Sequence, residues 1–327
     1  QSDLLAWYAE SKRDLPWRHT NDSWKILLSE ILLQQTQVSR GIHYWGKLVE
    51  RFPTPQSMAD AGVDEVLHLW QGAGYYSRAR RLHALSIQVC LPIEDGGFGG
   101  SLPKTAAELL NLPGVGPYTA AAVASIAHGE SVACVDGNIR RVMARQSKRV
   151  EPTMKEVEIW ANAVLYKDDA GDWNQALMEL GATVCTKANP TCNACPLNES
   201  CLSAFKVPQQ VNVTKAKNKK IILMSFALVQ TKKSLLLRKN DTESIWSSLW
   251  IPFENSTMQS HANKLELTRN EKFRHELTHR SLDLDINIYF SSKEFKLDTN
   301  QKYEWIKKDR IEDYGMPQPI TKLIQQL

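Results

Sequence analysis

The amino-acid sequence predicts a mostly α-helical N-terminal region followed by a smaller α+β domain. Long segments with helical periodicity, separated by Gly and Pro breaks, fill the chain up to about residue 205. Beyond residue 220 the pattern changes to short runs with strand character, and residues 282–290 alternate apolar and polar side chains. A chain of 327 residues is long enough for two domains of ordinary size.

The elements follow from local patterns. Helical periodicity predicts helices over residues 1–13, 22–38, 105–111 and 118–128. Residues 94–101 hold four glycines and predict a loop, while residues 206–220 hold five lysines and few apolar side chains, which is typical of an exposed linker. Strands are predicted over residues 221–230, 234–238 and 282–290.

The composition is that of a folded globular protein, with 43% hydrophobic and 23% charged residues. A net charge of +4 permits nucleic-acid binding without arguing for it. No stretch approaches the roughly 18 apolar residues of a membrane span, and residues 1–13 do not resemble a signal peptide. We therefore expect a cytoplasmic protein without a membrane partner, whose six cysteines serve as ligands or free thiols rather than disulfides.

Four cysteines are concentrated in 17 residues with the spacing C-x6-C-x2-C-x5-C, and these are Cys185, Cys192, Cys195 and Cys201. Four thiolates are the usual ligands of a 4Fe–4S cluster. Structural zinc sites usually combine two closely spaced couples, and here only Cys192 and Cys195 form one. The spacing therefore favours an iron–sulfur cluster over zinc. Cys90 and Cys134 lie in apolar surroundings and are expected to be core residues.

A glycine-containing turn, residues 112–117, joins two predicted helices. Gly114 and Gly116 permit a sharp turn and close approach of the backbone to a ligand. The helix that starts near Tyr118 offers free N–H groups at its N-terminus, which bind anions such as a DNA phosphate. The alternative is an ordinary connection between two helices.

Two carboxylates are candidates for catalysis. Glu30 shares a helical face with Ile26, Leu27, Leu33 and Gln34, so burial is expected to raise its pKa and suit it to general acid catalysis. The alternative is a structural glutamate paired with a base such as Arg18. Asp136 is placed to cap the helix that follows it, either as a cap alone or as a cap and catalytic carboxylate together.

The hairpin, Asp136 and the cysteine loop together resemble the helix-hairpin-helix DNA glycosylases that carry an iron–sulfur cluster. In the lyase branch, similar to endonuclease III, a lysine follows the hairpin and forms a Schiff base; here that position is Tyr118. In the adenine-DNA glycosylase (MutY) branch, a Ser-Glu pair precedes Leu-Gln-Gln-Thr, as Ser29-Glu30 precedes residues 33–36 here. The chain therefore resembles the MutY family.

This resemblance implies a domain organisation. Residues 1–20 and 131–205 would form an iron–sulfur helical subdomain, and residues 21–130 a six-helix barrel with the helix-hairpin-helix. Residues 206–220 would be a linker, and residues 221–327 a Nudix-like lesion-recognition domain. The C-terminal part lacks the Glu-rich box of Nudix hydrolases, so pyrophosphate hydrolysis is not expected.

The resemblance also implies a function and residue roles. The protein would be a monofunctional glycosylase of base excision repair that removes adenine opposite 8-oxoguanine or guanine after base flipping. Glu30 would be the general acid, Asp136 would stabilise the oxocarbenium ion, and Tyr118 and Asn138 would assist. The DNA and base-pocket positions are Arg18, Gln35, Tyr76, Arg78, Gly114 and Gly116, of which Gln35 and Tyr76 resemble residues that fill the gap or wedge the stack.

One family motif differs in this chain. Where the family has Phe-Ser-His in its lesion-recognition loop, residues 277–279 are Leu277, Thr278 and His279, so Leu277 lacks the aromatic ring. The implied partner is double-stranded DNA containing adenine opposite 8-oxoguanine, bound by a monomer that joins the bacterial nucleoid. An endonuclease III-like lyase and a non-catalytic iron–sulfur DNA-binding protein are the alternative interpretations.

Overall fold

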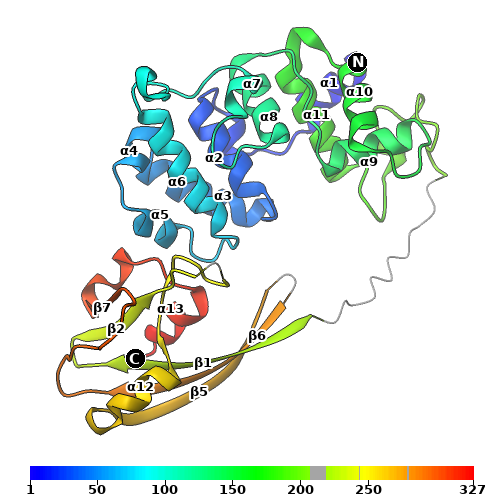
Figure 1. Ribbon diagram of the computed structural model, residues 1–327. Helices are drawn as coiled ribbons and strands as arrows, with labels where there is room; N and C mark the ends of the chain where they lie inside the picture. Colours follow the sequence, from blue (N-terminus) through cyan, green and yellow to red (C-terminus); the bar gives the residue numbers. More distant parts are fainter. Residues whose placement is uncertain (207–218, 243, 278–279) are drawn as a thin grey trace. The chain divides into compact units, whose positions relative to one another are not determined.

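A computed structural model describes residues 1–206, 219–242, 244–277 and 280–327 (Figure 1). The chain divides into two compact units, Gln1–Asp60 with Arg81–Val213 and Ala61–Arg80 with Thr214–Leu327. Most of the predicted linker, together with Thr278 and His279, lies outside the described residues. None of the helices in the described part of the chain combines the length and apolar character that a membrane crossing requires.

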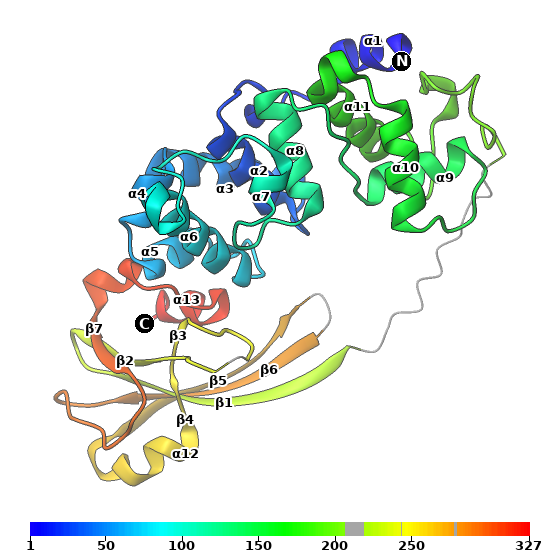
Figure 2. The ribbon, with the colours of Figure 1, turned by 45° about the horizontal axis from the view of Figure 1, so that its top comes forward.

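The first unit is helical, as predicted. Its helices are α1 (Ser2–Ser11), α2 (Ser23–Leu33), α3 (Val38–Arg51), α4 (Pro55–Ala59), α7 (Ala106–Leu109), α8 (Pro117–His128), α9 (Gly137–Gln146), α10 (Met154–Val164), α11 (Ala170–Thr183) and most of α6 (Ser77–Cys90). Helix α2 packs against α3 and α8, while α1, α9, α10 and α11 form a second group (Figure 2). Leu4, Ile139, Val157 and Trp173 belong to the apolar core of that second group.

The predicted helix over residues 22–38 is wrong in one respect, because the helix ends at Leu33 and the next one begins only at Val38. Asp22 caps the first, α2, by accepting hydrogen bonds from the backbone N–H groups of Trp24 and Lys25. The helix ends at Leu33, and Gln35 has a φ of +60°, in the left-handed region. The polar run over residues 34–37 has no apolar face to bury, so packing does not extend the helix through it.

The second unit contains a seven-stranded mixed sheet within its described residues. The strands are β1 (Lys220–Gln230), β2 (Ser234–Lys239), β3 (Trp250–Ile251), β4 (Phe253–Glu254), β5 (Glu266–Glu276), β6 (Arg280–Phe290) and β7 (Tyr303–Lys307). Their order is β3-β2-β1-β6-β5, with β4 paired to β1 and β7 paired to β2. Strands β1 and β6 pair in parallel, so the first strand lies beside one that comes about 60 residues later in the sequence.

Three helices accompany this sheet in the second unit: α5 (Val63–Leu69), α12 (Asn255–Met258) and α13 (Gln318–Ile324). The three predicted strands are confirmed as β1, β2 and β6. The alternation predicted for residues 282–290 is also confirmed, since Leu282, Leu284, Ile286 and Ile288 are all buried. The predicted fold class, a helical region followed by a smaller α+β domain, is therefore correct.

Candidate active site

A pocket of about 350 Å³ lies in the first unit and is lined by several segments that are far apart in the sequence. The N-terminal segment contributes Arg13, Trp17 and Arg18, and α2 contributes Glu30. Helix α8 contributes Tyr118 and α11 contributes Glu179; Asp136 and Asn138 complete the lining at the start of α9. The sequence-predicted catalytic residues and Arg18 therefore meet at one cavity.

Glu30 is 9% exposed and accepts a hydrogen bond of 2.7 Å from the hydroxyl of Tyr118 at its Oε2. Burial raises the pKa of Glu30 to about 7, and nearby Asp136 adds to the rise, while the hydrogen bond from Tyr118 and the charge of Arg18 oppose it. Glu30 is therefore partly protonated near neutral pH. The alternative of an ion pair with Arg18 is not what the structure shows, because Arg18 pairs with Glu179.

Asp136 caps α9, as predicted. Its Oδ1 accepts a hydrogen bond of 2.7 Å from the backbone N–H of Ile139, and its Oδ2 accepts one of 2.8 Å from the side-chain amide of Asn138. Burial raises the pKa of Asp136, and these hydrogen bonds oppose the rise. Because the same carboxylate lines the pocket, it can act on a bound group as well as cap a helix.

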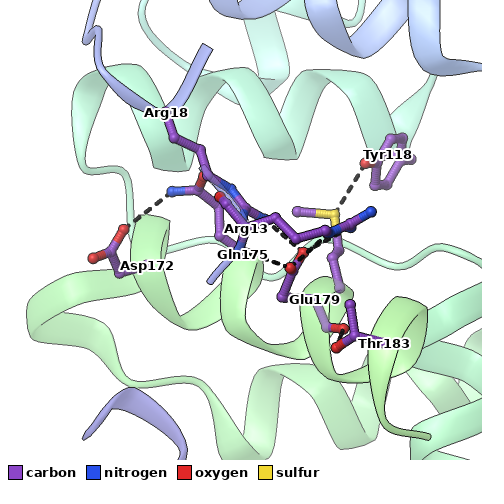
Figure 3. A network of polar contacts seen from close by, with 8 residues as sticks. Arg13, Arg18, Tyr118, Asp172, Gln175, Glu179 and Thr183 are labelled. Atoms are coloured by element: carbon purple, nitrogen blue, oxygen red, sulfur yellow. Dashed lines mark hydrogen bonds and ion pairs between the residues drawn. The ribbon is translucent and has the colours of Figure 1, made fainter. Parts of the chain in front are cut away.

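Glu179 on α11 is bound by two arginines of the N-terminal segment (Figure 3). Arg13 donates to both carboxylate oxygens, at 2.7 and 2.8 Å, and Arg18 donates to Oε2 at 2.8 Å. Burial alone would raise the pKa of Glu179, but the hydrogen bonds from Arg13 and Arg18 outweigh it and lower the pKa to about 2. This wall of the pocket thus carries a fixed ion-pair network.

Tyr118 contacts a second residue of α11. Its hydroxyl lies 3.0 Å from the sulfur of Met178, a contact drawn in Figure 3 beside the arginine network. Burial raises the pKa of Tyr118 well above its ordinary value, and the neighbouring Glu30 adds to this. The phenol therefore stays protonated and acts as a hydrogen-bond donor to Glu30.

Asn138 connects the pocket to the cysteine loop. Its side-chain oxygen accepts a hydrogen bond of 2.8 Å from Arg141, which also donates to the carbonyl of Cys185 at 2.8 Å. Arg145, one turn later on α9, donates to the carbonyls of Cys185, Thr186 and Lys187 and contacts the Cys185 sulfur at 3.2 Å. Helix α9 therefore holds both Asp136 and the start of the cysteine loop.

The four predicted ligand cysteines line a single cavity, together with Arg145 and Gln146 of α9. All four are partly buried free thiols. Among the residues that the structure describes, no set of three or more His, Cys, Asp or Glu side chains is arranged to hold a metal ion. The loop is fixed by contacts of its own, such as the hydrogen bond of 3.3 Å from the Asn198 amide to the Cys192 carbonyl.

The hairpin residues lie as predicted between α7 and α8. Gly114 has a φ of +81°, and a side chain there would place its Cβ 2.8 Å from the Cβ of Arg81. Gly116 is the N-cap of α8 with ordinary extended backbone, followed by Pro117. Gln35 is exposed at the end of α2 with a φ of +60°. Glycine is thus required by conformation at position 114 only.

The remaining predicted residues belong to the second unit. Tyr76 is half-buried, whereas its neighbour Tyr75 is 38% exposed and has a φ of +49°. Arg78 is only 8% exposed, and its guanidinium donates to backbone carbonyls of its own loop. Leu277 follows β5, and its N–H donates to the Arg280 carbonyl at 2.8 Å.

Sequence reasoning did not identify Arg13, Glu179 and Met178 as pocket residues. Glu179 lies on the buried face of α11, where a single acidic residue among apolar neighbours is the same signal that singled out Glu30. The left-handed backbone at Tyr75 was not predicted, although Gly72 and Gly74 before it were the available sign of an unusual turn.

Comparisons with known proteins agree with this geometry. Residues 28–163 match the model described as HhH-GPD superfamily base excision DNA repair protein, and residues 224–326 match the NUDIX domain model. The adenine DNA glycosylase of Buchnera aphidicola subsp. Baizongia pistaciae is 32% identical over 346 residues, which cover 99% of this chain and 95% of that protein. The adenine DNA glycosylase of Homo sapiens is 42% identical over 224 residues, 64% of this chain and 40% of that protein.

Two solved structures resemble the helical region. A thermostable thymine-DNA glycosylase superposes with a TM-score of 0.56 and 30% identity over 62% of this chain and 93% of that chain. A trapped endonuclease III–DNA covalent intermediate gives a TM-score of 0.53 at 23% identity, over 62% of this chain and 92% of that chain, which shows the fold alone.

The helical fold, the pocket that brings Glu30 and Asp136 together and the matching family model define a helix-hairpin-helix DNA glycosylase of base excision repair, an enzyme that hydrolyses N-glycosyl bonds. Because a relative matches over nearly the whole of both proteins, the chain belongs to the adenine DNA glycosylase family. The family predicted from the motifs is therefore confirmed, and DNA is the partner.

Proposed function

We propose that this protein removes adenine mispaired with 8-oxoguanine or guanine from duplex DNA, by hydrolysis and without lyase activity. The observation that carries the proposal is a buried, partly protonated Glu30 held by Tyr118 in a pocket that also contains Asp136. An adenine within a duplex cannot reach this pocket, so the nucleotide must flip out at a cost of a few kcal/mol.

Glu30 is proposed as the general acid and Asp136 as the second carboxylate. A proton passes from the Glu30 carboxyl to N7 of adenine, which makes the base a better leaving group as the bond to C1′ breaks. The developing positive charge on the sugar is stabilised by the Asp136 carboxylate, before water adds at C1′ and loses a proton. Asn138 holds Asp136 in place, and the Tyr118 hydroxyl orients Glu30.

Arg18 and Arg13 are proposed to shape the base-binding wall of the pocket with Glu179. Their mutual hydrogen bonds fix the charges in place before substrate arrives, so that little reorganisation accompanies binding. The phenol of Tyr118 lines the same pocket and contacts Met178, the neighbour of Glu179 on α11. This pre-organised wall favours one orientation of the flipped base.

The cysteine cavity is proposed to hold a 4Fe–4S cluster, whose ligands would be Cys185, Cys192, Cys195 and Cys201. Four thiols that line one cavity are the donor set that such a cluster takes. When bound, the cluster would supply a fixed scaffold for this loop, which Arg141 and Arg145 join to α9.

A basic groove supports a path for the DNA backbone. It has a volume of about 840 Å³ and is lined by seven cationic side chains: Arg140, Arg141, Arg145, Lys148, Arg149, Lys187 and Lys206. It begins at Gly137, next to Asp136 of the pocket, and follows α9, whose ten residues span about 15 Å. That length corresponds to roughly four phosphates of one strand.

Other DNA contacts are proposed from their position. The hairpin backbone at Gly114 and Gly116 and the first turn of α8 would bind a phosphate. Gln35, exposed in a left-handed conformation, and Tyr76 would fill or wedge the opened base stack. The protein would act as a monomer on the DNA of a bacterial nucleoid.

The C-terminal domain is proposed to recognise 8-oxoguanine through Leu277, Thr278 and His279, at the turn between β5 and β6. The proposed boundaries remain 1–20 with 131–205 for the iron–sulfur subdomain, 21–130 for the barrel, 206–220 for the linker and 221–327 for the Nudix-like domain. The packing of α1 with α9, α10 and α11 supports joining the first residues to the iron–sulfur subdomain.

The experiment is a single-turnover assay of adenine release from duplexes with adenine opposite 8-oxoguanine. The purified protein should release adenine, and Glu30→Gln should abolish release while duplex binding survives. Full activity of Glu30→Gln would overturn the acid assignment. Efficient trapping of a borohydride-reduced Schiff base would instead support the endonuclease III-like interpretation, since Tyr118 cannot form that bond.

A further inference from the structure

The turn between α5 and α6 has a strained backbone at an exposed aromatic residue. Gly72 and Gly74 have φ angles of +87° and +76°, which glycine adopts without strain. Tyr75 has a φ of +49° and is 38% exposed. A bulky residue with a φ in this region is strained, so the surrounding structure must hold it there.

Arg78 and Trp70 supply contacts that hold this turn. One terminal nitrogen of Arg78 donates to the carbonyls of Ala73, at 3.2 Å, and Gly74, at 3.0 Å. The Trp70 indole N–H also donates to the Gly74 carbonyl, at 3.0 Å. The carbonyl immediately before the strained residue is therefore bound from two sides.

The guanidinium of Arg78 also lies between two rings. Its Cζ is 5.2 Å from the centre of the Trp70 ring and 5.7 Å from that of Tyr75. The side chain is 8% exposed, and burial lowers its pKa to about 10, so it stays charged at neutral pH. One of its terminal nitrogens donates to two carbonyls of its own loop, which is the geometry of an internal support.

We propose that Arg78 is a positioning residue for base opening: it holds the turn at Gly74 so that the exposed ring of Tyr75 is ready to enter the base stack. The proposal rests on the function proposed above, because it requires that the enzyme opens the duplex at its target. Arg78 then acts through Tyr75 and not through a DNA phosphate.

These two roles for Arg78 differ in their salt dependence. Removing a cation that contacts a phosphate lowers the slope of log K against log salt concentration by about one. Removing an internal support leaves the slope unchanged and slows opening of the target. Lysine cannot replace arginine here, because an ammonium group lacks the planar surface that lies against the rings of Trp70 and Tyr75.

The test is a double-mutant cycle with Arg78→Lys and Tyr75→Ala, in a Glu30→Gln background that prevents excision. Duplexes carry 2-aminopurine in place of the target adenine opposite 8-oxoguanine, and stopped-flow fluorescence reports its opening. Arg78→Lys should slow opening by roughly ten- to a hundredfold when Tyr75 is present, and should have no further effect when Tyr75 is alanine. The salt slope of duplex binding should be unchanged.

Independent, multiplicative effects of the two substitutions would overturn the proposal, as would a loss of about one in the salt slope. Arg310→Lys, at an exposed ion pair with Asp313, is the control and should open the target at the rate of the parent protein. Thermal unfolding checks that each variant folds. If Arg78→Lys does not fold, Arg78→Gln replaces it, since its amide can still donate to one carbonyl and should retain part of the opening rate.

Failure of the proposed function gives a different result. In that case the protein with arginine at position 78 and tyrosine at position 75 would itself show no opening of 2-aminopurine opposite 8-oxoguanine. Both proposals would then be contradicted together. If that protein opens the target normally, and Arg78→Lys and Tyr75→Ala slow opening independently of each other, only the role of Arg78 is contradicted.

Discussion

At the scale of single residues, the chemistry depends on how the surroundings in the pocket shift the pKa values of Glu30 and Asp136. Burial raises the pKa of both carboxyl groups, and that of Glu30 rises to about 7. Asp136 accepts two hydrogen bonds that favour its charged form, from Ile139 and Asn138. One carboxyl can thus keep its proton while the other remains ionised, which is the division of roles that two-carboxylate glycoside hydrolysis requires.

The pH dependence of adenine release tests this division. Glu30 must be protonated to act, so the single-turnover rate should fall as pH rises above about 7. It should also fall at acidic pH, where Asp136 takes up a proton, which gives a bell-shaped profile. A rate that stays constant through neutral pH into the alkaline range would contradict Glu30 as the acid.

The Glu179 network makes a prediction about stability. The pKa of Glu179 falls from 4.5 to about 2 on folding, so its contribution to stability is present above pH 4.5 and is lost as pH decreases toward 2. Glu179→Gln should lower the free energy of unfolding at neutral pH by about 3 kcal/mol. This is the lower end of the range for removing one partner of a buried ion pair, because the side chain of Arg13 is 40% exposed.

Denaturant unfolding at about pH 6 and about pH 3 measures this effect. The difference between Glu179→Gln and the parent protein should shrink at the lower pH. Asp313→Asn, which breaks an exposed ion pair with Arg310, should change stability little at either pH. An equal loss of stability at both pH values would show that Glu179 acts through packing alone.

At the scale of elements, the hairpin before α8 contains two glycines, and the conformation of the backbone requires glycine at Gly114 but not at Gly116. Gly114→Ala should lower the free energy of unfolding by about 1–2 kcal/mol, because of its φ of +81° and the contact with Arg81. Gly116→Ala should leave stability unchanged, since a Cβ there meets nothing within 4 Å. If this backbone binds phosphate, both variants should weaken duplex binding, which a fluorescence anisotropy titration measures.

The junction between α9 and the cysteine loop is a second element-scale feature. Arg145→Met should reduce the iron and sulfide content of protein purified without oxygen, because it removes the hydrogen bonds that hold the carbonyls of residues 185–187. Arg149→Met, just beyond the end of α9 and paired with Glu156, should retain full iron content. Equal iron retention in both variants would show that the loop holds the cluster without help from α9.

At the scale of the whole molecule, two units of different architecture are expected to contribute to adenine removal, one by catalysis and the other by recognition of the lesion. The pocket that would break the bond lies in the helical unit, while the predicted lesion-recognition turn belongs to the unit that contains the sheet. Changes at that turn should therefore affect which mispair is chosen more than the speed of the chemical step.

Leu277→Phe tests this separation. Restoring the aromatic ring should raise the ratio of kcat/KM for adenine opposite 8-oxoguanine over adenine opposite guanine by about fivefold, the effect of about 1 kcal/mol of stacking. The single-turnover rate at saturation should not change. Leu267→Phe, at an exposed apolar position on β5, should leave the ratio unaltered. An unchanged ratio in Leu277→Phe would contradict the role of this position.

The sequence by itself determined the class of fold, the strands β1, β2 and β6 and the four clustered cysteines. Periodicity, turn residues and spacing are local features that can be read along the chain. Motif resemblance then correctly identified the family and placed Glu30 and Asp136 among the site residues. The end of α2 at Leu33 was missed, because helix periodicity continues through residues whose packing does not support a helix.

Only the tertiary structure decided how the site residues meet. Tyr118 binds Glu30 across 88 residues of sequence. Glu179 binds Arg13 and Arg18 across 166 and 161 residues. Tertiary packing also turned Arg78 inward and left Tyr75 exposed. Burial, which sets both the pKa of Glu30 and the role of Arg78, arises from contacts between distant segments, and no local pattern records which segments those are.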